Sequence, residues 1–187
     1  MTGSSVLPVT FHKGKLYFLF GKENPLEDSA KGYSDFGGGV ESGESIFETA
    51  MREGGEELTG FLGDGSVLKK HIKKHGGYYK IVHNDYHIHL FHYPYDERLP
   101  IYYNQNHQFL WHRMDKQLLN KTKLFEKIRI DWFDIKSMKK KIREFRPFYQ
   151  DIVRTIIRHE SKIKKFLKKC QKTRKIKKTK NSTRKFR

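Results

Sequence analysis

The stretch GGVESGESIFETAMREGGEE, residues 38–57, decides how the rest of this 187-residue sequence is interpreted. Its opening glycines allow the backbone to adopt unusual dihedral angles and to approach a ligand closely. A helix is predicted to begin after Ser45, because Glu48 follows at the spacing of a capping box. The apolar residues at helical spacing are Ile46, Phe47, Ala50, Met51 and Leu58, and Gly60 is expected to end the helix. Gly54 and Gly55 are anomalous there, since each costs about 1 kcal/mol relative to Ala.

Three carboxylates are gathered on this predicted helix: those of Glu53, Glu56 and Glu57. Glu53 precedes the other two by three and four residues, so all three lie near one face. Like charges at this spacing destabilise a helix by roughly 0.2–0.5 kcal/mol per pair. A hard divalent cation with oxygen ligands would reverse the sign of that interaction. The pattern therefore indicates a metal site, and the alternative is a solvated acidic helix face with coincidental glycines.

The spacing Gly38-x5-Glu44-x7-Arg52-Glu53-x2-Glu56-Glu57 resembles the Nudix box, the signature of the Nudix hydrolases. The preceding residues Phe36 and Gly37 also match the usual pattern. Two departures are present: Gly54 replaces a bulky apolar residue, and Thr59 delays the glycine that follows the paired glutamates to Gly60. Both departures affect the packing and the end of the helix, not the carboxylates.

The resemblance implies a hydrolase that uses Mg²⁺ or Mn²⁺ and cleaves a nucleoside diphosphate linked to another moiety. Such metals neutralise developing phosphate charge and lower the pKa of bound water. The capped 5′ end of mRNA is the substrate favoured by the basic tail described below. Small nucleotides, nucleotide sugars and diphosphoinositol polyphosphates stay open. A second class of function is a non-catalytic nucleic-acid-binding protein on a Nudix scaffold, although such a relative would tend to lose the box carboxylates.

The resemblance also assigns roles to individual residues. It implies that Glu53 and Glu57 ligate metal and that Glu56 bridges metals or acts as general base. Arg52 is expected to orient the carboxylates through charge-assisted hydrogen bonds. The loop residues implied in substrate binding or loop anchoring are Gly38, Gly39 and Glu44, and a carbonyl of Gly37 or Gly38 is expected to complete the metal coordination. Some relatives use a base outside the box, for which Glu97 and Glu126 are the candidates.

The remaining periodicities predict an α+β domain. Strands are expected over residues 6–11, 16–20 and 128–133, and over 67–72 and 78–95 on the two sides of a turn at Gly76-Gly77, with weaker candidates at 99–106 and 109–114. Helices are expected over 137–144 and after Pro147. This order is not a regular βαβ alternation, so a Nudix fold with a mixed sheet sandwiched between helices is predicted. Residues 1–158 would form that domain and 159–187 a basic, partly disordered extension.

The formal net charge of +18 is concentrated at the C-terminal end. Residues 160–187 contain 14 basic residues and 1 acidic residue, and residues 1–159 contain the other 25 and 20. A basic amphipathic helix is expected to continue to about residue 170. RNA contact is predicted for Lys164, Lys165, Lys168, Lys169, Arg174, Lys175, Lys177 and Lys178. The alternatives are a nuclear address, an acidic membrane surface and a solubilising tail without a specific partner.

Several side chains outside the box have two interpretations. The histidines at 83, 87, 89 and 92 indicate either a zinc site or a strand face. The aromatic residues at 93, 95, 102, 103, 109 and 111 are expected in the core, with one or two facing the substrate. The lysine pairs at 69–70 and 73–74 suit polyphosphate binding or a solvated strand edge. The oligomeric state stays open.

Composition excludes other classes of protein. The longest strongly apolar run is Leu16 to Phe20, far shorter than the ~20 residues of a transmembrane helix. The N-terminal residues lack the pattern of a signal peptide. A single cysteine, Cys170, cannot form an intramolecular disulfide, so an intracellular location, cytoplasmic or nuclear, is expected.

Overall fold

The computed structural model describes residues 2–24, 31–122 and 126–171. Its strands are β1 (Gly3–His12), β2 (Lys15–Glu23), β3 (Tyr33–Ser34), β4 (Phe36–Gly39), β5 (Tyr78–His83), β6 (Tyr86–His92) and β7 (Lys127–Asp134). Its helices are α1 (Ile46–Glu57), α2 (Gly65–Lys74), α3 (Arg98–Arg113), α4 (Lys116–Thr122), α5 (Ile135–Lys140), the short 3₁₀ helix η1 (Ile142–Glu144) and α6 (Tyr149–Arg158). Residues 160–171 are also helical.

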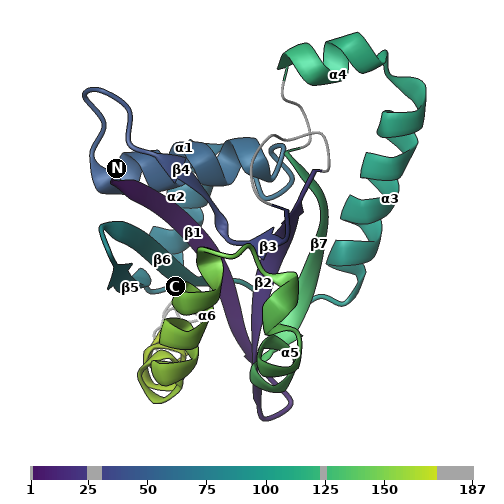
Figure 1. The fold of residues 1–187 in the computed structure, drawn as a ribbon. Helices are drawn as coiled ribbons and strands as arrows, with labels where there is room; N and C mark the ends of the chain where they lie inside the picture. The colour runs from purple at the N-terminus through teal and green to yellow at the C-terminus, as the bar shows by residue number, and fades with distance from the viewer. Residues whose placement is uncertain (1, 25–30, 123–125, 172–187) are drawn as a thin grey trace, which may run out of the picture.

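Strand β1 organises a mixed sheet in which it has different partners along its length. It pairs in parallel with β6 on one side. On the other side its first half pairs with β4, and its second half pairs with β2, both antiparallel. β2 in turn pairs with β3 and β7. The pairing partner of β1 therefore changes from β4 to β2 near the middle of the strand. The glycine-rich segment, the sheet and α1 meet at this point (Figure 1).

Each face of the sheet has its own hydrophobic core, as the alternation of side chains along a strand requires. Phe18 and Phe20 of β2 pack in a core with α5, α6 and the helical residues 160–171. Leu19, between them, packs in the second core with α1, α2 and α3. The predicted mixed sheet sandwiched between helices is therefore confirmed, and Figure 1 shows α1 with α2 and α5 with α6 as separate layers.

The prediction of a strand at residues 67–72 is wrong, since this segment lies in α2. Asp64 caps the helix, and its side chain accepts hydrogen bonds from the backbone amides of Ser66 and Val67 at 2.8 and 2.9 Å. Leu68 and Ile72, four residues apart, are buried. The lysine pairs at 69–70 and 73–74 are exposed on a helix rather than along a strand edge. The capping and the i, i+4 spacing outweighed the apparent strand pattern.

Strands predicted at 99–106 and 109–114 are also wrong, because the single helix α3 covers both. Leu99, Tyr103 and His107 are buried at spacings of four residues. The aromatic content that favours strands was overridden by this tertiary packing. Asn104 attaches α3 to the outer edge of β7: its amide accepts a hydrogen bond from the Ile130 amide at 2.9 Å and donates one to the Ile130 carbonyl at 3.3 Å.

The segment 78–95, predicted as one strand, is divided into β5 and β6 by a turn at Asn84-Asp85 that was not predicted. Both residues have positive φ, 46° and 61°, which suits a tight hairpin with right-handed twist. Asn and Asp tolerate this conformation better than other residues with side chains. Gly76 and Gly77 instead connect α2 to β5.

The C-terminal segment follows the predictions more closely. The helix expected over 137–144 appears as α5 followed by η1, and α6 begins just after Pro147. The amphipathic helix expected to about residue 170 is present, with Ile163 and Leu167 fully buried in the core next to α6. Among the described residues, no helix has the length and apolar character needed to cross a bilayer.

The glycines inside α1 have a packing reason. A Cβ at Gly54 would lie 2.5 Å from Cγ2 of Val6 on β1, and one at Gly55 would lie 3.0 Å from the amide nitrogen of Gly65. Gly65 itself approaches the carbonyl of Met51, where a Cβ would lie 2.8 Å away. Glycine at these positions therefore allows α1 to pack closely against both the sheet and α2.

We expect Gly54→Ala to lower the free energy of unfolding by about 1–2 kcal/mol, because the overpacking against Val6 exceeds the gain of about 1 kcal/mol in helix propensity. Denaturant unfolding of the purified protein measures this change. Lys73→Ala, on the exposed side of α2, is the control and should change stability by less than about 0.5 kcal/mol. A stabilised Gly54→Ala protein would contradict the packing explanation.

Candidate active site

The predicted start of the box helix is confirmed. The Ser45 hydroxyl accepts a hydrogen bond from the Glu48 amide, and the Glu48 carboxylate accepts one from the Ser45 amide at 3.0 Å, which completes a capping box. β4 precedes this helix and is held against β1 through the pairs Gly37↔Ser5 and Gly39↔Gly3. The capping box and the strand pairing fix both ends of the loop between β4 and α1.

Arg52 connects the carboxylates of the box. Its Nε and Nη2 donate to the two oxygens of Glu44 at 2.7 and 3.1 Å. Its Nη1 donates to Glu53 at 2.9 Å and to Glu56 at 3.1 Å. Its Nη2 also donates to the carbonyl of Gly39 at 3.2 Å. One planar guanidinium thus joins the loop to the helix, which is a geometry that Arg supports and Lys does not.

The glycine strand lies directly against two of the glutamates. A Cβ at Gly38 would lie 2.3 Å from Oε1 of Glu53, and one at Gly37 would lie 2.3 Å from Cβ of Ser5. The Gly37 amide donates to Oε2 of Glu57 at 2.7 Å. Any side chain at Gly37 or Gly38 would push the strand away from β1 or displace Glu53. The structure therefore explains why the spacing of glycines and glutamates matters.

Glu57 belongs to a buried ion cluster, defined here as Glu23, Glu57, Lys127 and Arg146. Lys127 is fully buried and its ammonium lies 3.1 Å from Glu57 and in contact with Glu23. Arg146 contacts the same oxygen of Glu23 at 2.8 Å. The Lys127 ammonium also donates to the Ser34 hydroxyl at 2.9 Å. The cluster has two charges of each sign, so its formal charges balance.

The electrostatics of these carboxylates differ. Hydrogen bonds from Arg52 and Thr49 lower the pKa of Glu44 to about 2. Burial raises the pKa of Glu53, and the charge of Arg52 opposes that shift. Burial also raises the pKa of Glu57, against the opposing charge of Lys127. Burial alone would lower the pKa of Lys127, but Glu57 and Glu23 outweigh it and raise that pKa.

The oxygen donors of the box suit a hard divalent cation chemically. The side chain of Glu56 is 61% exposed and that of Glu53 is 14% exposed, so both have access to solvent. Glu57 is almost fully buried, and its two oxygens contact Lys127 and Gly37. Within the described ranges, no group of three His, Cys, Asp or Glu side chains is arranged as a ready metal site. In place of a metal, Arg52 is the counterion of Glu53 and Glu56, and Lys127 is the counterion of Glu57.

The zinc site considered as one alternative for these histidines is not formed, since no such metal-binding group occurs in the part of the chain that the structure describes. His89 is buried, and its Nδ1 lies 3.0 Å from the carbonyl of Ser5. Burial lowers the pKa of His89 to about 4. His92 is buried as well, whereas His83 and His87 are partly exposed.

The two candidate bases outside the box lie in different places. Glu97 precedes the first turn of α3. Glu126 directly precedes Lys127, and its carbonyl accepts a hydrogen bond from the Asn24 amide at 2.8 Å. The charge of Glu126 also contributes to the raised pKa of Glu57. Glu126 is therefore the candidate associated with the box.

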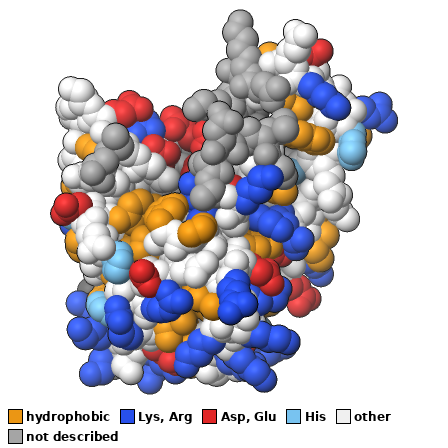
Figure 2. All heavy atoms as spheres, in the orientation of Figure 1, with side chains coloured by type: hydrophobic (Ala, Val, Ile, Leu, Met, Phe, Trp, Pro, Cys, Tyr) orange, Lys and Arg blue, Asp and Glu red, His pale blue; other side chains and the backbone are white. Residues whose placement is uncertain are grey.

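The residues predicted to contact RNA fall into two groups. Lys165, Lys168 and Lys169 are exposed on the helical segment 160–171, and Lys164 is half-buried in an ion pair with Glu160 at 2.6 Å. The other four, Arg174, Lys175, Lys177 and Lys178, lie outside the described residues. Figure 2 shows lysine and arginine side chains gathered over the lower part of the molecule, over α5 and α6, and acidic side chains at the upper left over β4 and α1.

Sequence reasoning missed Lys127, Glu23 and Tyr103 as parts of the site. The hydroxyl of Tyr103 donates to the carbonyls of Glu57 and Lys127 at 3.3 and 3.1 Å, which joins α3 to the end of the box helix. The sequence did contain a signal for the two charged residues. Glu23 ends a strand-like apolar run and Lys127 begins one, and a charge at such a position needs a buried partner.

The chain has the mixed sheet between helices and the loop-helix arrangement expected from the sequence. No protein-family model and no curated protein matches it. Similar solved structures include an Ap4A hydrolase from C. elegans in a binary complex, 13% identical with a TM-score of 0.45, covering 83% of this chain and 93% of that one. A NUDIX hydrolase from Nitrosomonas europaea is 18% identical with a TM-score of 0.40, covering 86% and 91%. The C. elegans Ap4A hydrolase in another structure is 13% identical with a TM-score of 0.38, covering 77% and 86%.

We expect Lys127→Met to lower the free energy of unfolding by about 3–5 kcal/mol, because Glu23 and Glu57 would lose a buried counterion. Chemical denaturation followed by circular dichroism measures the loss. Lys15→Met, which removes an exposed ion pair with Asp134, is the control and should cost less than about 1 kcal/mol. Equal losses in the two variants would show that the buried cluster has no special role.

Proposed function

We propose that this chain is a Nudix pyrophosphohydrolase that depends on a divalent metal, Mg²⁺ or Mn²⁺. The observation that carries the proposal is the network around Arg52, which holds the carboxylates of Glu44, Glu53 and Glu56 against the glycine strand. A solvated acidic helix face would not need a partly buried guanidinium that is hydrogen-bonded to three carboxylates and to a loop carbonyl. Repulsion among these glutamates is offset by Arg52, which leaves Glu53 and Glu56 accessible at the loop.

The residues of the box have distinct proposed roles. Glu53 and Glu56 would hold the metal, with the carbonyl of Gly37 or Gly38 completing the set. Glu57 would position the end of the helix behind them, because its two oxygens contact Lys127 and the Gly37 amide. The metal, when bound, neutralises phosphate charge and lowers the pKa of a bound water. Glu56, the most exposed of the three, would accept the proton of the attacking water. The water attacks a phosphorus of the pyrophosphate bridge, and the phosphate on the other side leaves.

The experiment that tests this function is a hydrolysis screen with and without chelator. Purified protein with Mg²⁺ or Mn²⁺ should cleave at least one of capped RNA, dinucleoside polyphosphates, nucleotide sugars, nucleoside triphosphates and diphosphoinositol polyphosphates. EDTA should abolish turnover, and added metal should restore it. Absence of turnover on every substrate with either metal would refute the enzyme and favour a non-catalytic nucleic-acid-binding protein.

We expect Glu56→Gln to lower kcat by at least about a hundredfold without changing the circular dichroism spectrum, since the amide cannot accept the proton from water. Steady-state kinetics on the substrate found in the screen measure the effect. Glu126→Gln is the informative comparison, because Glu126 is the base candidate outside the box. Loss of activity in Glu126→Gln with normal activity in Glu56→Gln would transfer the role of base to Glu126.

We further propose that the basic C-terminal region binds RNA, so that capped RNA is the favoured substrate among those named above. Two observations support RNA. The lysines of the helical segment 160–171 continue onto the basic surface of α5 and α6 in Figure 2. Four lysines, Lys15, Lys136, Lys139 and Lys164, line a groove of about 370 Å³ that also holds Asp134 and Glu160, the ion-pair partners of Lys15 and Lys164. Clustered cations of this kind neutralise backbone phosphates without reading sequence.

Deletion of residues 172–187 should weaken binding of single-stranded RNA and flatten its salt dependence. This segment contains nine basic residues, and each lost phosphate contact lowers the slope of log K against log salt by about 0.7. The helical segment 160–171 is retained, because Ile163 and Leu167 belong to the core. A tail of equal length with its nine basic residues replaced by Gln should behave like the deletion. An unchanged slope in both would remove the tail from RNA binding.

A further inference from the structure

Four aromatic side chains form one cluster at the end of the sheet where β1 turns into β2, beside α5 (Figure 1). This cluster, here called the aromatic surface, consists of His12 of β1, Tyr17 of β2, Trp132 of β7 and Tyr95, which follows β6. Tyr95 lies at its centre. Its ring stacks on His12 with centroids 4.4 Å apart and planes at 16°, and its centroid lies 4.8 Å from that of Tyr17 and 5.5 Å from that of Trp132.

The aromatic surface is not part of either hydrophobic core. Its four members are partly exposed, and only Trp132 packs against a core cluster. The Trp132 indole donates a hydrogen bond to the carbonyl of Asp96 at 2.9 Å, which fixes the segment that carries Tyr95. Within the described ranges, the hydroxyls of Tyr17 and Tyr95 and the ring nitrogens of His12 form no hydrogen bond with another residue. The rings are therefore positioned by one another and still accessible to a ligand.

The turn between β1 and β2 joins the aromatic surface to the groove lined by four lysines. His12 is paired in the sheet with Lys15, and Gly14 and Lys15 line the groove. Tyr17 is paired with Asp134, which also lines the groove and contacts Lys15 at 3.5 Å. Two of the four rings are thus direct neighbours of groove residues, so one ligand can contact both.

The groove keeps a positive charge in spite of its ion pairs. Its four lysines outnumber its two acidic residues, Asp134 and Glu160, which leaves an excess of two positive charges. Lys15 is 62% exposed, so its ammonium can contact solvent and ligands as well as Asp134. Lys136 and Lys139 are exposed on α5. The ligand that matches this combination has negative charges next to flat apolar rings.

We propose that the aromatic surface stacks the bases of single-stranded RNA whose phosphates lie along the four-lysine groove. This inference rests on the RNA binding proposed above, since Lys164 of the C-terminal region lines the groove, but it does not depend on hydrolysis. Proteins that bind single strands combine a positive groove with aromatic side chains on which successive bases stack. A duplex keeps its bases stacked inside the helix, so it fits the lysines but not the rings.

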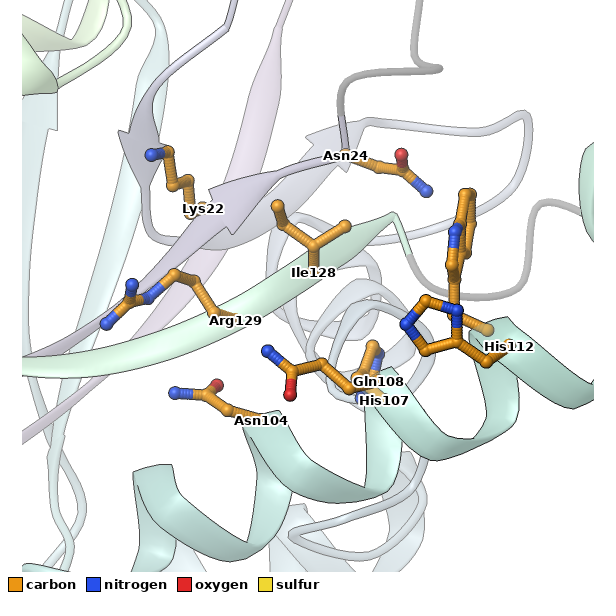
Figure 3. Close-up of a pocket in the computed structure, with 9 residues that line it drawn as sticks. Lys22, Asn24, Asn104, His107, Gln108, His112, Ile128 and Arg129 are labelled. Atoms are coloured by element: carbon orange, nitrogen blue, oxygen red, sulfur yellow. The ribbon is translucent and has the colours of Figure 1, made fainter.

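The competing location for a base is a pocket of about 590 Å³ between α3, β2 and β7. Figure 3 shows Lys22 and Arg129 in its lining, and Trp111 of α3 lines it as well. Arg129 is already paired with Asp131 at 2.7 and 2.8 Å. None of the residues that line this pocket belongs to the aromatic surface. Since the chain has two tryptophans, one in each location, their fluorescence distinguishes the two.

Binding of short strands tests the aromatic surface separately from catalysis. The probes are labelled oligouridylate, an RNA duplex of the same length, and a single strand of that length in which abasic sites replace the bases, each titrated by fluorescence anisotropy. Tyr95→Ala and His12→Ala should each weaken oligouridylate binding about tenfold, in the range for loss of a base–aromatic stack. Binding of the duplex and of the abasic strand should change less than twofold.

Two control variants accompany these measurements. Tyr95→Phe keeps the ring and should bind oligouridylate like the wild type. Tyr102→Ala removes a tyrosine that is 54% exposed on α3, outside the aromatic surface, and should also leave binding unchanged. Circular dichroism verifies that each variant is folded, and His12→Ala supplies the measurement if Tyr95→Ala does not fold.

Tryptophan fluorescence locates the stacked base. In Trp111→Phe, Trp132 is the sole tryptophan, and oligouridylate should quench it whereas the abasic strand should not. Quenching that occurs only in Trp132→Phe, where Trp111 is the sole tryptophan, would place the base in the pocket of Figure 3 and overturn the proposal.

The outcomes separate this proposal from the earlier ones. Equal oligouridylate affinities in the wild type, Tyr95→Ala and His12→Ala would overturn the aromatic surface, even if the salt dependence shows that the tail binds RNA. Equal losses for all three probes would overturn stacking as well, because the abasic strand has no bases. Ring-dependent binding in a protein that cleaves nothing would support the aromatic surface and overturn the hydrolase alone. A wild-type protein that binds none of the strands would overturn both RNA proposals.

Discussion

The buried ammonium of Lys127 constrains more of this structure than any other single group. It lies between Glu23 at the end of β2 and Glu57 at the end of the box helix, and it begins β7 itself. A charge removed from water must be paired with good geometry, so these three elements cannot move independently. Arg146 extends the constraint to the segment before α6 by contacting Glu23. The last glutamate of the box is therefore positioned by the packing of the whole sheet.

The candidate site combines this rigid part with a more accessible one. Glu57 is fixed from within, whereas Glu53 and Glu56 are held from the solvent side by Arg52. The acidic cluster and the basic surface lie at different ends of the molecule (Figure 2), so the large positive charge does not neutralise the site.

How much the sequence could predict depended on whether the relevant contacts are local. The capping box of Ser45 and Glu48 and the stripe of α1 are set by neighbours three or four residues apart, and they were predicted correctly. The strand pattern of β1, β2 and β7 was also readable. The helix α3 was not, because its aromatic residues favour strands until Tyr103 is buried beneath α1 and β7. The buried ion cluster joins residues as many as 123 positions apart, and a periodicity in the sequence cannot indicate such a contact.

The attachment of α3 through Asn104 has a consequence for how this protein behaves in concentrated solution. β7 pairs with β2 along one side only, and an open strand edge is a template for pairing with another chain. The Asn104 side chain forms hydrogen bonds with both the amide and the carbonyl of Ile130, so it occupies the middle of that edge. A single carboxamide thereby protects the sheet against strand addition from a second molecule, and its loss would make self-association, rather than unfolding, the first visible defect.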